Sequence, residues 1–104
     1  MYSDEKLAEM ICHEEMIMEG LDKSFWRFIK LPSPQIWEHT TENVEEYSWV
    51  LAIVGQHCIY FDGENCNYSI AQFNNYWEIG KVKREDENLH ELITGIVRSR
   101  FARL

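Results

Sequence analysis

Two cysteines flank a short acidic turn in the segment CIYFDGENCNYSI, residues 58–70, and His57 stands directly before the first of them. Thiols and imidazoles together can bind zinc or carry out redox and nucleophilic chemistry. Structural zinc sites usually present paired ligands two to four residues apart, however, and the sequence contains no such pair. His57 and Cys58 would point to opposite faces of a strand, and a loop of two or four residues would place Cys58 and Cys66 on opposite faces of the hairpin. We therefore expect no metal site and no cofactor.

Catalytic groups are equally hard to assemble from the sequence. Two histidines adjoin cysteines, but the side chains of adjacent residues diverge by about 100° on a helix and about 180° on a strand. The other two, His39 and His90, stand alone in the sequence. No serine lies in a G-x-S-x-G elbow, and the five glycines are too scattered to form a phosphate-binding loop. The sequence predicts no catalytic residue, so we expect that the protein is not an enzyme.

The distribution of charge is more informative. The chain has a net charge of −8, and residues 31–80 contain seven acidic side chains without one lysine or arginine. Such a field repels nucleic-acid phosphates and attracts a basic protein surface. Aromatic residues are interleaved with these acids, and carboxylates beside flat rings hold Arg and Lys through ion pairs and cation–π contacts. The residues predicted to bind a partner are Glu38, Glu42, Glu45, Glu46, Tyr60, Asp62, Glu64 and Trp77.

A second interpretation stays open, in which the acidic middle of the chain serves solubility alone. The protein would then be a non-catalytic oligomeric scaffold or accessory subunit, with an interface that buries Trp37 and Trp77. For Trp37, Tyr60 and Trp77 the sequence is compatible with either a core or an interface position.

The elements that must position these residues follow from the hydrophobic pattern. Apolar spacing predicts a helix over residues 4–19, interrupted at Glu14, then a short helix or irregular aromatic plug that ends at Pro32 and Pro34. Residues 47–54, 57–61 and 66–72 favour strands, with a fourth, edge strand within residues 74–84. A final helix follows Asn88, whose distance to Glu91 fits a capping box. The fold class expected is α+β, with an antiparallel meander sheet of three to four strands packed against an N-terminal and a C-terminal helix.

Length and composition fit one domain over residues 1–104. No apolar run reaches the roughly 18 residues of a membrane span, and acids occupy the N-terminus where a signal peptide would be basic and then apolar. We expect a cytoplasmic protein with no membrane partner, a monomer or homodimer. The three cysteines should be reduced and buried as small hydrophobic residues.

Several features occur in order over about residues 47–95, nearly half of the chain: Trp49 leads an apolar strand to Gly55, and then come the residues YFD at 60–62, NYSI at 67–70, and an acidic, leucine-rich helix. In these features the chain resembles a family of small bacterial immunity proteins encoded with polymorphic or contact-dependent inhibition toxins. The resemblance implies an inhibitor that binds one cognate toxin domain, often a basic nuclease, and occludes its active site or substrate surface. It supplies no catalytic residues and no contact residues, because contacts in such proteins vary with the toxin.

Overall fold

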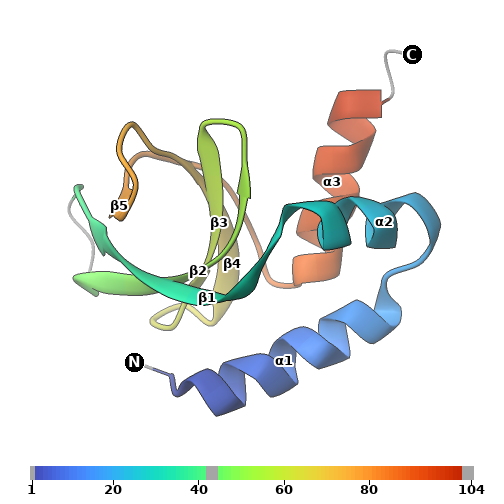
Figure 1. Ribbon diagram of the computed structural model, residues 1–104, viewed down its shortest axis with the longest axis horizontal. Helices are drawn as coiled ribbons and strands as arrows, with labels where there is room; N and C mark the ends of the chain where they lie inside the picture. Colours follow the sequence, from blue (N-terminus) through green and yellow to red (C-terminus); the bar gives the residue numbers. More distant parts are fainter. Residues whose placement is uncertain (1, 42–44, 102–104) are drawn as a thin grey trace.

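A computed structural model describes residues 2–41 and 45–101 of the chain (Figure 1). It confirms the α+β class, with two helices before the sheet and one after it. The elements in chain order are α1 (Asp4–Ile17), α2 (Gly20–Ile29), β1 (Lys30–His39), β2 (Tyr47–Val54), β3 (His57–Asp62), β4 (Asn67–Gln72), β5 (Glu78–Ile79), β6 (Val82–Asp86) and α3 (Leu89–Phe101). Within these residues no helix has the length and apolar character needed to cross a membrane.

The sheet differs from the antiparallel meander that the sequence predicts. It has six strands in the order β5-β1-β2-β3-β4-β6, and it is mixed because β5 pairs with β1 in parallel. The predicted strands correspond to β2, β3 and β4, which pair antiparallel in sequence order. Figure 1 shows the sheet curling on one side of the molecule, with α2 and α3 together on the other side.

The curl is produced by the segment in which the sequence predicts one edge strand. That segment forms two short strands at opposite edges of the sheet, β5 beside β1 and β6 beside β4, with Gly80 between them. The Gly80 N–H donates to the Gln72 carbonyl oxygen at 2.9 Å, and a Cβ on Gly80 would overlap that oxygen. Glycine is therefore needed here because the crossing segment lies against the backbone of β4.

Strand β1 was not predicted, because Pro32 and Pro34 indicate the end of an element. Proline is tolerated in strands at irregularities of the ladder, and the register of β1 against β2 shifts between Lys30 and Gln35, which encloses both prolines. Beyond the shift the pairing is regular, with Trp37 opposite Ser48. The segment after α2 is thus a strand that extends the sheet beyond β2.

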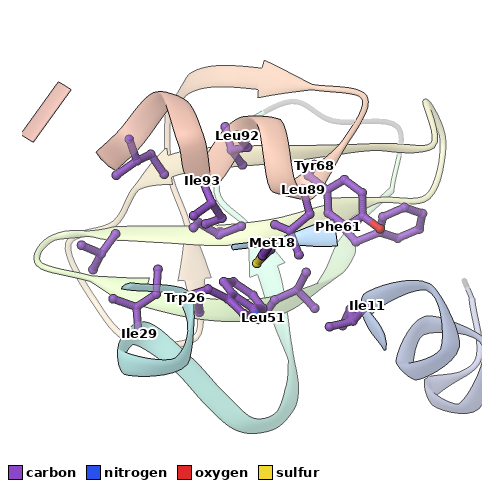
Figure 2. Close-up of a cluster of buried hydrophobic side chains, with 14 of the residues drawn as sticks. Ile11, Met18, Trp26, Ile29, Leu51, Phe61, Tyr68, Leu89, Leu92 and Ile93 are labelled. Carbon is purple, nitrogen blue, oxygen red and sulfur yellow. The ribbon is translucent and has the colours of Figure 1, made fainter. Parts of the chain in front are cut away.

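Two hydrophobic clusters stabilise the fold, one on each side of the sheet. The helix-side cluster joins α1, α2 and α3 to the sheet, and Figure 2 shows Trp26, Leu51, Phe61 and Leu92 among its side chains. The inner cluster fills the curl of the sheet and consists of Trp37, Val50, Cys58, Tyr60, Ala71, Phe73 and Ile79. Because β3 is covered on both sides, its residues from Cys58 to Asp62 are all buried.

Candidate partner-binding surface

Two of the predicted contact residues are in the interior. Tyr60 is 2% exposed and belongs to the inner cluster, where its ring meets that of His39 at 5.2 Å between centroids. Burial raises the pKa of the Tyr60 hydroxyl to about 12. The expectation that Tyr60 lies on a binding surface is therefore wrong, because the sheet curls over the face from which its side chain projects.

Asp62 is also not at the surface of the hairpin tip, since it is only 5% exposed. Its carboxylate accepts the backbone N–H of Glu64 at 3.0 Å and of Asn65 at 3.3 Å, as well as the Asn65 side-chain amide at 2.9 Å. These bonds make Asp62 the residue that shapes the loop of residues 63–66. Its predicted role in partner contact is corrected to a structural role in the turn.

The structure brings the two predicted acidic segments together. Glu64 is exposed at the hairpin tip, and its backbone N–H donates to Oε1 of Glu45 at 3.1 Å. Glu46 is exposed beside Glu45, and its carbonyl oxygen accepts the His39 N–H at 2.8 Å, which holds this part of the chain against the end of β1. Glu42 lies outside the described residues.

Carboxylates and aromatic rings continue across the end of the sheet from Glu46. Glu38 is opposite Glu78 in the β1–β5 pair and opposite Tyr47 in the β1–β2 pair, so these three side chains share one face. Glu38 is exposed and Tyr47 is 45% exposed. We define the acid–aromatic surface as Glu38, Glu45, Glu46, Tyr47, Glu64, Tyr76, Trp77 and Glu78.

Trp77 has the most unusual backbone on this surface. Its φ is +77°, a left-handed conformation that a bulky residue rarely adopts, and its side chain is 57% exposed. The Trp77 carbonyl oxygen accepts the Glu38 N–H at 2.9 Å, and its ring lies 6.1 Å from that of buried Trp37. Tyr76, 66% exposed, contacts Trp37 as well. The inner cluster thus supports two aromatic rings that are exposed to solvent.

A pocket of about 220 Å³ lies at the same edge of the sheet as Glu78. Its lining offers one carboxylate, two side-chain amides and a hydroxyl, from Glu78, Asn74, Asn75 and Thr40, with Gly80 completing the wall. The Thr40 hydroxyl donates to the Ile79 carbonyl oxygen at 2.9 Å, so its lone pairs remain as acceptors. Such a set of oxygen acceptors suits the ammonium or guanidinium group of an incoming side chain.

The cysteines do not form a cluster. Cys58 is buried in the inner cluster, where burial raises the pKa of its thiol to about 12. Cys12 and Cys66 are exposed, so the expectation that all three are buried is wrong. Cys66 contacts the Tyr2 hydroxyl at 3.2 Å, outside the inner cluster that holds Cys58. In the described part of the chain no three His, Cys, Asp or Glu side chains are grouped to hold a metal ion.

The two histidines that stand alone in the sequence have hydrogen-bond partners in the structure. His39 Nε2 lies 2.8 Å from the Ser48 hydroxyl oxygen, and His90 Nδ1 lies 2.8 Å from Oε2 of Glu14. Ser48 is 2% exposed, so the His39–Ser48 pair joins β1 to β2 in the interior. Neither pair could be found from sequence spacing, because each depends on elements that meet only in the fold.

Comparisons of the chain with protein-family models, with curated proteins and with solved structures found no match.

Proposed function

We propose that this chain is an immunity-type protein that binds a cognate toxin domain and neutralises it by occluding its active site or substrate surface. The toxin proposed is a basic protein of the nuclease type. The observation that carries the proposal is the continuous row of Glu78, Glu38 and Tyr47 beside exposed Trp77, in a stretch of fifty residues without lysine or arginine. The interaction needs no catalytic residue and no cofactor in this chain.

A nuclease presents a basic surface to its nucleic-acid substrate. A protein that binds nucleic acid presents Lys and Arg to phosphates, and an inhibitor that covers this surface needs carboxylates in their place. Fixed carboxylates steer the encounter, while large aromatic residues supply most of the affinity at interface centres. Tyr76 and Trp77 have the exposure for this role, and the inner cluster behind them holds their rings in place.

The pocket lined by Glu78 gives the proposed interface a specific contact. A lysine or arginine of the toxin that enters this pocket would meet the Glu78 carboxylate and the amide oxygens of Asn74 and Asn75. This pocket is where we place the centre of the interface.

The proposal is tested by protection of cells. Co-expression of the chain with the toxin domain encoded by the neighbouring upstream gene is expected to restore growth that the toxin alone stops. A chain carrying Trp77→Ala and Glu78→Lys should fold and should fail to protect. If cells die at the same rate with and without the unaltered chain, immunity against that toxin is wrong.

A scaffold or accessory subunit is the second candidate, and exposed apolar residues of the helices favour it. Phe28 is 90% exposed on α2, and Leu21, seven residues earlier on the same helix, is 58% exposed. Met16 and Ile17 at the end of α1 are exposed as well. An interface that buries Trp37, as the sequence would allow, is excluded because Trp37 is already 0% exposed. Light scattering of the chain with Phe28→Ser tests this candidate, which requires a large species that the substitution dissociates.

A further inference from the structure

A second hollow, unrelated to the acid–aromatic surface, lies between α3 and the sheet. It has a volume of about 210 Å³ and is bounded by β3, β4 and β6 on the sheet side. None of its lining side chains is a carboxylate, whereas three are basic. We name it the basic cleft, lined by His57, Ile70, Lys83, Arg84, Gly95, Ile96 and Ser99.

The Arg84 side chain reaches this cleft because Gly95 of the facing helix has no side chain. Arg84 is opposite Ile70 in the β4–β6 pair, so its side chain projects from the same face of the sheet as Ile70. Its guanidinium lies over Gly95 of α3, and a Cβ on Gly95 would overlap it. The absence of a side chain at Gly95 therefore lets the guanidinium of the exposed Arg84 lie directly against α3.

No ion pair among residues 2–41 and 45–101 neutralises the charges of the cleft. The ion pairs among the described residues are Lys30 with Glu15 and His90 with Glu14, and neither includes Lys83 or Arg84. In a chain with a net charge of −8, basic side chains have many carboxylates with which to pair. Two exposed cations, neither of them in an ion pair among the described residues, line this cleft together with an imidazole and the Ser99 hydroxyl, and such a lining suits an external anion.

We propose that the basic cleft binds a small molecule that carries a phosphate or carboxylate group. The Arg84 guanidinium provides a planar fork that fits either oxyanion, and Lys83, His57 and Ser99 add further donors. Ile70 and Ile96 supply an apolar floor for the body of the molecule. The volume is below the roughly 300 Å³ of drug-sized pockets, so the ligand is small.

NMR titration of the full chain tests this proposal, with phenyl phosphate, benzoate and inorganic phosphate as the probes. Phenyl phosphate or benzoate should shift the amide signals of Ile70, Arg84, Gly95 and Ser99, and the tighter of the two identifies the preferred head group. Inorganic phosphate should bind more weakly, because it leaves the apolar floor uncovered. Equal binding of all three probes would overturn the proposed role of that floor.

Matched variants separate a built site from general attraction to basic side chains. Arg84→Gln should weaken binding about tenfold, the effect of one lost charged hydrogen bond. Lys81→Gln removes the same charge from a residue that does not line the cleft, and it should leave binding unchanged. Gly95→Ala keeps every charge but displaces the guanidinium, so it should weaken binding while circular dichroism shows an unchanged helix content. Equal effects of Arg84→Gln and Lys81→Gln, or full binding by Gly95→Ala, would overturn the proposal.

Discussion

Glu14 of α1 caps the N-terminus of α3 from a position 75 residues earlier in the chain. Its Oε1 accepts the backbone N–H groups of Leu89 and His90, while its Oε2 pairs with His90 Nδ1 at 2.8 Å. A carboxylate is favourable here because it satisfies orphan N–H groups and faces the positive end of the helix dipole. This contact explains why the apolar stripe of α1 is interrupted at residue 14, which is 8% exposed.

Replacement of Glu14 by alanine should lower the free energy of unfolding by about 2 to 3 kcal/mol, because it removes a cap and leaves buried N–H groups without an acceptor. Urea denaturation followed by circular dichroism measures the change. Glu9→Ala, on an exposed position of the same helix, is the control and should change the free energy by no more than about 0.5 kcal/mol. Equal effects of the two substitutions would show that the cap does not contribute.

The stability of the fold should decrease below neutral pH because of His39. Burial lowers the pKa of this imidazole below its ordinary value of 6.5, against the opposing effects of Asp62 and Glu45. The unfolded chain therefore binds a proton at residue 39 more readily than the folded chain does. The contribution of His39 is present above the unfolded pKa and is lost as the pH falls below about 6.5.

Other groups titrate in the same range, so the test compares His39→Gln with the unaltered chain at about pH 7.5 and about pH 5.5. Glutamine keeps a hydrogen bond to Ser48 without the titration. The loss of unfolding free energy on acidification should be smaller in His39→Gln, and His13→Gln, at an exposed position, should behave as the unaltered chain. An identical loss in all three proteins would contradict the burial of a neutral His39.

Thiol reactivity should divide the cysteines into two classes. Cys58 is buried with a thiol pKa of about 12, so it should react with Ellman's reagent only when the protein unfolds. Cys12 and Cys66 are exposed and should react in the folded protein. Rapid reaction of Cys58 in the folded state would contradict its place in the inner cluster and would revive a cysteine nucleophile.

Substitutions of Trp77 should differ in their effect on the stability of the fold but not in their effect on binding. Glycine adopts φ of +77° without strain, so Trp77→Gly should be more stable than Trp77→Ala by about 1 kcal/mol, the reverse of the usual order. Both variants lose the exposed ring and should bind the toxin about thirtyfold more weakly, as expected for a contact at the centre of an interface. If alanine is the more stable variant, the backbone at residue 77 does not impose the strain described here.

The sequence predicts the elements whose signals are local. The final helix and the three strands around the hairpin follow from apolar spacing and from turn residues such as Asp62 and Gly63. Strand β1 could not be predicted because its prolines indicate the end of an element. The parallel pairing of β5 with β1 could not be predicted because the two strands lie some forty residues apart in the chain.

The exposure of the residues proposed to bind a partner could be predicted only in part. Glu38, Glu46, Glu64 and Trp77 are exposed as expected, whereas Tyr60 and Asp62 are buried because the sheet curls back on itself. Alternation along β3 assigns Tyr60 and Phe61 to opposite faces but does not reveal that both faces are covered. Tyr47 and Glu78 were not predicted, because they belong to the surface only through their pairing with Glu38 across β1.

The binding affinity between the chain and the toxin domain that we propose as its partner tests the acid–aromatic surface most directly. Calorimetry would measure the affinities of two double variants. The first carries Glu38→Lys and Glu78→Lys. The second carries Glu5→Lys and Glu9→Lys at exposed positions of α1 and serves as a control of equal net charge. We predict that the first protein binds about a hundredfold more weakly, with a reduced dependence on salt, while the control retains most of its affinity. Equal affinities of the two proteins for the toxin would contradict the proposal that this surface is the interface.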